Sequence, residues 1–195
     1  MSDTELQPPA PAAYEPPSVL DELPGDLMMW VLIVSELLVF GAGLAAFLGV
    51  RITDPLGFAE AQDALHRTAA GINTVVLVTS GFFAALAVRM AEHGRKAATR
   101  GWLAAASALG IVFLVIKVME YAEKASHGIG VETNSFFTFY YLLTGFHAAH
   151  VVAGIVILGL VSIRCTPRTV EVGAAFWHMV DLVWVLLFPV IYLLR

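Results

Sequence analysis

The residues of this sequence that could do chemistry in an apolar setting are histidines and acids at helical spacing. His147 and His150 lie three residues apart and so share a helix face, and His178 precedes Asp181 by the same interval. Imidazoles in this pattern can serve as axial ligands of a b-type haem or, with a carboxylate, as ligands of copper or zinc. A carboxyl group inside a membrane can instead carry a proton.

Glu36 is the candidate carboxyl group, because it lies within the first apolar stretch of the chain. A charged acid at the centre of a membrane helix costs about 2.5 to 3.5 kcal/mol on insertion scales. We therefore expect Glu36 to be protonated and to share a hydrogen bond with a neutral imidazole. His147 is the expected partner, and His150 is the alternative.

Haem or metal binding would need ligands from different helices. His147 or His150 could pair with His178 across a haem, but His178 comes only about four residues after the expected start of its helix, so the depths fit poorly. A metal site of Glu36, His147 and His150 would have no further thiolate or carboxylate nearby. We expect no metal, redox cofactor or catalytic residue in this chain. Hydrogen bonding between helices stays open as the role of all three histidines.

Five apolar stretches must position these residues, and they lie at 27–50, 69–90, 102–120, 136–163 and 174–194. The composition, 58% hydrophobic and 14% charged residues, is typical of an integral membrane protein. The stretch 136–163 contains no Asp, Glu, Lys or Arg and would form a helix of roughly 42 Å, longer than a hydrocarbon core of about 30 Å. The sequence therefore predicts an all-α bundle of five transmembrane helices, residues 27–195.

The segments outside the apolar stretches give further expectations. Residues 1–26 hold six of the nine prolines and no Lys or Arg, which predicts a disordered acidic tail and a retained first helix rather than a cleaved signal peptide. A short helix is expected near residues 60–66. Cys165 is the only cysteine, so no disulfide or thiolate cluster is expected, and no basic patch suggests nucleic acid.

Two further features concern the surface of the bundle. Lys117, Glu120 and Lys124 end the third stretch at helical spacing, and we interpret them as the point where this helix leaves the bilayer. Gly145, Ala149 and Ala153 form a flat stripe suited to close helix packing. The distribution of Lys and Arg over the loops favours a cytoplasmic N-terminus and a periplasmic or extracellular C-terminus.

Five short motifs in a fixed order carry a resemblance to a known family. They are S-E-x-x-x-F at 35–40, N-T-x-x-L-x-x-S-G at 73–81, E-Y-x-E at 120–123, G-F-H-x-x-H-V at 145–151 and W-H-x-V-D-x-V-W at 177–184. The match runs through nearly everything after Gly25. The chain resembles the cytochrome c oxidase subunit 3 family, in its short five-helix bacterial form, and is most similar to the branch associated with nitric oxide reductases.

The resemblance implies an accessory, non-catalytic subunit III of a haem-copper oxidase in a bacterial inner membrane. Haem and copper would be held by partner subunits I and II, while this subunit would bind phospholipid between its helices and support proton uptake. The residues expected to form an intramembrane polar network are Glu36, Glu120, His147, His150, His178 and Asp181. Those expected to make packing or lipid contacts are Asn73, Tyr121, Trp177 and Trp184.

Three other functions stay open on the sequence. An accessory subunit of a nitric oxide reductase is the nearest alternative. A small b-haem redox anchor and a proton channel or transporter that uses Glu36 as its carrier are the others. Because the small-residue stripe exceeds what a bundle of this size needs for itself, we expect the protein to be stable only beside a larger partner.

Overall fold

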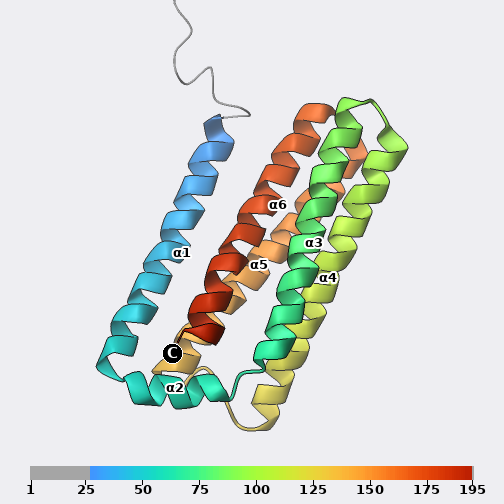
Figure 1. Cartoon of the computed structure of the whole chain (residues 1–195). Coiled ribbons are helices and arrows are strands. Elements are labelled where there is room, and N and C mark those ends of the chain that lie inside the picture. The colour runs from blue at the N-terminus through green and yellow to red at the C-terminus, as the bar shows by residue number, and fades with distance from the viewer. Residues whose placement is uncertain (1–26, 195) are drawn as a thin grey trace, which may run out of the picture.

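The computed structural model describes residues 27–194, so the predicted tail at 1–26 lies outside the described residues. Within 27–194 the elements are α1 (Leu27–Thr53), α2 (Pro55–Asp63), α3 (Arg67–Glu92), α4 (Lys96–Ser126), α5 (Ser135–Arg164), α6 (Pro167–Phe188) and a terminal π-helix, η1 (Pro189–Leu193) (Figure 1). Five helices are long and apolar enough to cross a membrane, the last one combining α6 with η1. The predicted all-α fold with five membrane spans is confirmed.

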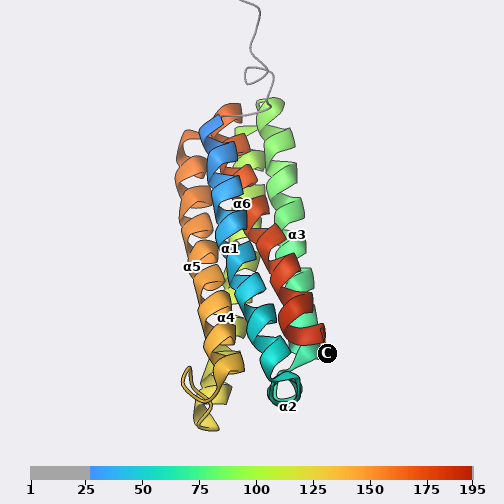
Figure 2. The ribbon, with the colours of Figure 1, turned by 90° about the vertical axis from the view of Figure 1, so that its left-hand side faces the viewer.

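The long helices run side by side, and α2 lies across one end of them (Figures 1 and 2). Helices α3, α4, α5 and α6 pack on one another. Among the long helices, α1 packs mainly against α5 and α6. The start of α1 and the end of η1 lie at opposite ends of the bundle (Figure 1), as five crossings require.

Three helix starts differ from the expected positions. Helix α4 begins at Lys96 rather than near residue 102, without a side-chain cap, whereas the starts of α6 and α2 are set by capping residues in the loops. Helix α6 begins at Pro167 rather than near residue 174, since Thr166 and Thr169 form a reciprocal capping box and proline is favoured in the first turn. Helix α2 begins at Pro55, after Asp54, whose side chain accepts a hydrogen bond from the Gly57 amide. The expected short helix is therefore present but lies several residues earlier than predicted.

Trp177 of α6 forms the centre of the bundle and is fully buried. Its ring lies against Gly110 of α4 and Gly154 of α5, where an added Cβ would stand 2.6 Å from ring carbons. Its indole N–H donates to the Ser80 hydroxyl of α3 at 3.0 Å. One side chain thus fixes the separation of four helices, because the two glycines admit the ring and the hydroxyl satisfies its only polar atom.

The Trp177 contact predicts different effects for two glycine substitutions in α5. Gly154→Ala should lower the melting temperature of the purified protein, because its new methyl group meets a rigid ring. Gly159→Ala is the matched control, since nothing lies within 4 Å of the Cβ position there, and the gain in helix propensity is the same, up to about 1 kcal/mol. Scanning fluorimetry in detergent measures both. Equal melting temperatures for the two variants would contradict this packing.

Candidate functional site: a buried polar network

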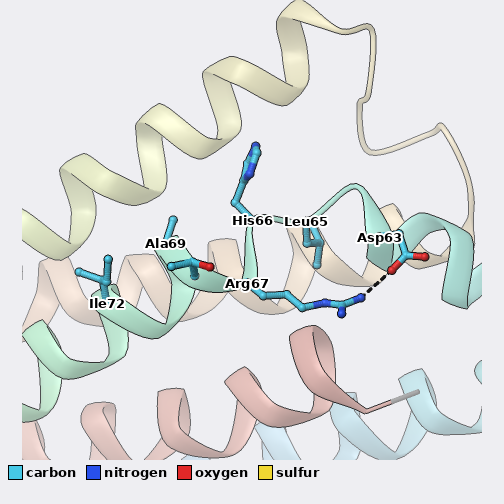
Figure 3. Close-up of a pocket in the computed structure, with 7 residues that line it drawn as sticks. Asp63, Leu65, His66, Arg67, Ala69 and Ile72 are labelled. Carbon is cyan, nitrogen blue, oxygen red and sulfur yellow. Dashed lines mark hydrogen bonds and ion pairs between the residues drawn. The ribbon is translucent and has the colours of Figure 1, made fainter.

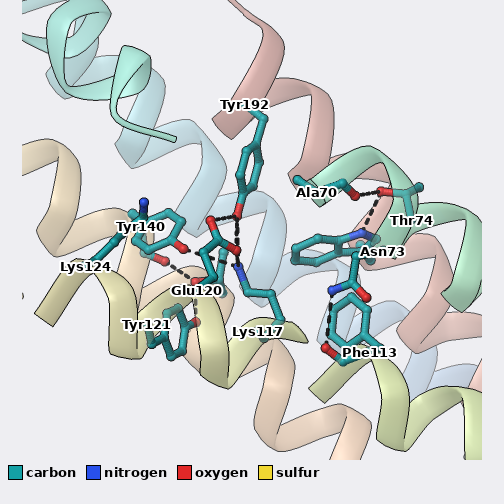
Figure 4. A network of polar contacts seen from close by, with 12 residues as sticks. Ala70, Asn73, Thr74, Phe113, Lys117, Glu120, Tyr121, Lys124, Tyr140 and Tyr192 are labelled. Atoms are coloured by element: carbon teal, nitrogen blue, oxygen red, sulfur yellow. Dashed lines mark hydrogen bonds and ion pairs between the residues drawn. The ribbon is translucent and has the colours of Figure 1, made fainter. Parts of the chain in front are cut away.

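Lys117 and Glu120 form an ion pair inside the bundle, on the face of α4 that packs against the other helices. Lys117 Nζ lies 2.9 Å from Glu120 Oε2, and the two side chains are 2% and 7% exposed. Tyr192 of η1 donates to Glu120 Oε1 at 3.0 Å and accepts from Lys117 at 2.8 Å (Figure 4). Both side chains point into the protein rather than toward solvent. Where α4 leaves the bilayer stays a prediction.

The ammonium group of Lys117 is fully satisfied by its surroundings. Its third donor reaches the Tyr140 hydroxyl at 3.3 Å, so all three N–H groups have an acceptor. The rings of Tyr121, Tyr140, Trp184 and Tyr192 surround it, with centroids 5.0 to 5.5 Å away. Removing two ions from water costs several kcal/mol each, and this shell is what offsets that cost. Glu120 was among the predicted network residues, whereas Lys117 was missed as one.

Around this pair, α4 bonds to α5 and to the α2–α3 junction. Tyr121 and Thr144 share a hydrogen bond of 2.6 Å, and Lys124 donates to the Ala64 carbonyl at 3.1 Å. Further out, His66 lies 2.8 Å from Glu123, with both side chains about half exposed. At this end of the bundle, polar contacts thus join α4 to α5 and to the α2–α3 junction, and the outermost of them, His66–Glu123, is half exposed.

A shallow pocket lies at the same end, where α2 meets α3 (Figure 3). Arg67 and Asp63 line it and form an ion pair of 2.6 Å. His66, another lining residue, is directed toward α4 (Figure 3). The two charged side chains of this pocket bond to each other and the His66 ring bonds to α4, and we assign the pocket no ligand.

Asn73 and Trp184 form hydrogen bonds between helices. The Asn73 side-chain amide donates to the Phe113 carbonyl at 3.3 Å, and the Trp184 indole donates to the Thr74 hydroxyl at 3.0 Å (Figure 4). Both residues are fully buried. With Trp177 they hold α3 against α4 and α6. All three side chains are buried inside the bundle and therefore do not contact bulk lipid.

Glu36 lies beside His150, the alternative partner named from the sequence, and not beside His147, the first expected partner. Glu36 Oε2 lies 3.1 Å from His150 Nε2, between α1 and α5, with side chains 21% and 15% exposed. The approach lacks hydrogen-bond alignment, since the same oxygen has no hydrogen-bond partner among the described residues. His147 is on a neighbouring face of α5 that is turned into the bundle, where its ring lies 6.3 Å from the ring of Phe40 on α1 and neither ring nitrogen has a hydrogen-bond partner among the described residues. The protonation of Glu36 stays a prediction.

His147 is enclosed by aromatic rings. It is fully buried, with ring centroids 5.1 Å from Trp184 and 5.6 Å from Phe113. Neither ring nitrogen has a hydrogen-bond partner among residues 27–194. Because rings cover it on two sides, His147 is poorly placed to face a haem, whatever the depth of its helix position.

His178 and Asp181 lie close together without a hydrogen bond. His178 Nδ1 is 4.0 Å from Asp181 Oδ2, which is too long, and both carboxyl oxygens of Asp181 have no partner within the described part of the chain. Both residues were expected in the intramembrane polar network, but in this geometry they do not hydrogen-bond to each other. The depth estimate also changes, since His178 follows Pro167 by eleven residues and lies roughly 16 Å along the helix, near mid-membrane.

Metal ligands do not gather in the described residues. Between 27 and 194 no three His, Cys, Asp or Glu side chains are arranged to hold one ion. The expectation that this chain binds no redox cofactor stays a prediction. The Lys117–Glu120 pair, Asn73 and the two tryptophans connect helices to one another. With five helices long and apolar enough to cross a membrane, these contacts define a multi-pass membrane protein.

Comparison with known proteins identifies the family. The family model described as cytochrome c oxidase subunit III matches residues 21–195. Cytochrome c oxidase subunit 3 of Corynebacterium diphtheriae is 31% identical over 176 residues, covering 85% of this chain and 86% of that protein. The Synechocystis subunit 3 is 31% identical over 87% of this chain and 76% of its own length. A probable quinol oxidase subunit 3 of Staphylococcus epidermidis is 26% identical, with 86% and 88% covered. The chain belongs to the cytochrome c oxidase subunit III family.

The buried ion pair predicts a non-additive stability effect. Lys117→Met should destabilise the protein by about 3 to 5 kcal/mol, because it leaves Glu120 charged and unpaired in the bundle. Adding Glu120→Gln should restore much of the loss, since the amide needs no counter-charge. Unfolding in denaturant measures all three variants. A double variant that loses the sum of the two single effects would show that the two residues act independently.

The Glu36–His150 contact predicts which histidine controls the acid. In the carboxyl region of the infrared spectrum, the band that Glu36→Gln removes should shift in His150→Ala, because that variant deletes the nearest polar atom. His147→Ala, the comparison variant, should leave the band in place while lowering stability through its cavity. A shift of the Glu36 band in His147→Ala but not in His150→Ala would show that Glu36 pairs with His147, the partner first expected from the sequence.

Proposed function

We propose that this chain is an accessory, non-catalytic subunit III of a haem-copper terminal oxidase in a bacterial plasma membrane. Family membership over residues 21–195 supports the proposal, as do relatives named cytochrome c oxidase and quinol oxidase subunits. Haem and copper would be held by partner subunits I and II. The electron donor of the complex, cytochrome c or quinol, would be selected by those partners.

The observation that carries this proposal is how little of α1 the chain itself covers. Of the apolar window of α1, 11% is buried, and its stripe of Gly41, Ala45 and Gly49 is exposed. On α5, Ala149 and Ala153 are exposed, and nothing lies within 4 Å of a Cβ built on Gly145. Lipid gives no reason for a flat helix surface, whereas another helix does. Both faces thus suit close packing by helices of a larger subunit.

In such a complex the chain would act on its partner through contact. We propose from the resemblance that it binds phospholipid between its helices and supports proton uptake by subunit I, with its N-terminus in the cytoplasm. The buried ion pair and the central tryptophan would keep the docking faces of α1 and α5 in a constant arrangement. On this proposal, the buried ion pair and the Trp177 hydrogen bond serve to hold the helices of the chain together.

An accessory role beside a nitric oxide reductase is the second candidate. It is favoured by E-Y-A-E-K at 120–124, followed by T-N-S-F-F at 133–137, which is similar to that branch of the family. The same segments supply Glu120 and Lys124 to the polar contacts of α4, so they have a structural role in either complex. The named oxidase relatives favour the first candidate.

Purification of the tagged chain from native membranes tests the proposal. In mild detergent it should bring down a haem-containing subunit, and the complex should consume oxygen with reduced cytochrome c or quinol. Consumption of nitric oxide but not of oxygen would select the second candidate. Recovery of the chain as a stable monomer without haem protein would sink both, as would a Soret band retained by the isolated chain.

A further inference from the structure

His178 is exposed in the middle of a membrane-spanning helix, where lipid offers nothing to bond with. Its side chain is 45% exposed, and it lies roughly 16 Å from the start of α6, beyond the reach of a lipid headgroup. Leu182, one turn further along the same face, is also exposed, as are Val78 and Phe82 on the neighbouring helix α3. A polar ring is thus surrounded by an apolar surface open to whatever lies outside the chain.

The carboxyl group of Asp181 lies next to the His178 ring, on its buried side, and accepts no hydrogen bond from the described residues. Its two carboxyl oxygens are buried without a hydrogen-bond partner in the described residues. The carboxyl group fits against α3 only because residue 81 is glycine, where an added Cβ would stand 2.1 Å from Oδ2 and 3.4 Å from the Nδ1 of His178. The carboxyl group and the exposed imidazole are therefore adjacent, and Nδ1 is the ring nitrogen 4.0 Å from that carboxyl group.

Two unsatisfied polar groups side by side are costly in a bilayer. An unpaired polar group in hydrocarbon costs several kcal/mol, and intramembrane ionisable residues normally find partners within protein. The other intramembrane couple of this chain, Glu36 and His150, lies 3.1 Å apart and is mostly covered. Of these two couples within residues 27–194, the one on α6 presents a member outward, where a second molecule could supply its partner.

We propose that the face of α6 around His178 binds a transmembrane helix of the haem-containing subunit, and that this helix presents a hydrogen-bond donor to His178. On docking, the Nδ1–H of His178 would donate to Asp181, which fixes the tautomer and leaves Nε2 as an acceptor. A hydroxyl, indole or amide N–H in an apolar helix is the chemistry that fits. This inference rests on the proposed function, because that function supplies the partner.

Photo-crosslinking in the intact membrane tests where the partner lies without depending on the stability of a variant. A benzoylphenylalanine at Leu182 should form an adduct with the haem-containing subunit, identified by mass spectrometry. The same probe at Val118, an exposed position on α4, is the matched control and should give no such adduct. Adducts from Leu182 with lipid only, or with a second copy of this chain, would overturn the inference. So would equal adducts from both positions.

Substitution of His178 tests the hydrogen bond itself. His178→Phe should increase the rate at which the haem-containing subunit dissociates in detergent by on the order of tenfold, the effect of one hydrogen bond between membrane helices. His178→Gln should restore retention, because its carbonyl oxygen is again an acceptor. His127→Phe, an exposed histidine at the end of α4, is the control and should leave retention unchanged.

The outcomes separate this inference from the proposed function. If the unsubstituted chain retains no haem-containing subunit, both fail. If it retains that subunit while Leu182 gives no adduct, only the docking face is wrong. If His178→Phe lowers the melting temperature of the intact complex and leaves the dissociation rate unchanged, the side chain has a structural role within the chain and the proposed hydrogen bond is refuted.

Discussion

The cost of a charge in an apolar bundle controls the architecture of this protein. Lys117 and Glu120 can remain buried only if their hydrogen-bonding groups are occupied, and the hydroxyls of Tyr140 and Tyr192 occupy them. Those two tyrosines come from α5 and from the end of the chain. The ion pair therefore dictates that α5 and the C-terminal segment approach α4 on one side, and the helices between them follow.

The C-terminal segment shows how far this requirement extends. Pro189 has no amide hydrogen, and the helix continues beyond it as a π-helix that carries Tyr192 to the ion pair. Gln62 of α2 donates to the Ile191 carbonyl at 2.7 Å, and Arg51 of α1 donates to the Leu194 carbonyl. Polar groups from distant parts of the sequence thus hold the last turn in place. The crosswise position of α2 is explained by this role.

The polar groups that are left over indicate what the protein is for. Its internal hydrogen bonds satisfy the ion pair and the tryptophans, and His147 is sealed among rings. The flat faces of α1 and α5 are exposed. In the His178–Asp181 couple of α6 the imidazole is exposed and the carboxyl group is buried without a hydrogen-bond partner among the described residues. A chain that completes its own core but leaves small-residue faces and an outward imidazole in the membrane has the surface of a subunit, which agrees with its family.

The sequence by itself determined the membrane spans, the all-α class and the family. Long apolar runs, the spacing of the motifs and the absence of charge from 136–163 are local properties that need no knowledge of packing. Glu36, His150 and Trp177 were also recognisable, because polar or bulky residues at helical spacing in an apolar stretch are conspicuous. Helix starts at Pro55 and Pro167 were misplaced, since caps in the loops were not weighed against apolarity.

Tertiary structure alone decided how the polar residues are paired. Glu36 meets His150 rather than His147 because the rotation of α5 turns the latter toward Trp184, and no local pattern fixes the rotation of a helix about its axis. Lys117 and Glu120 were read as the end of a span, since their spacing is equally that of a solvated pair. Whether such a pair faces water or the core depends on Tyr140 and Tyr192, which are far away in sequence and arrive only when the helices pack.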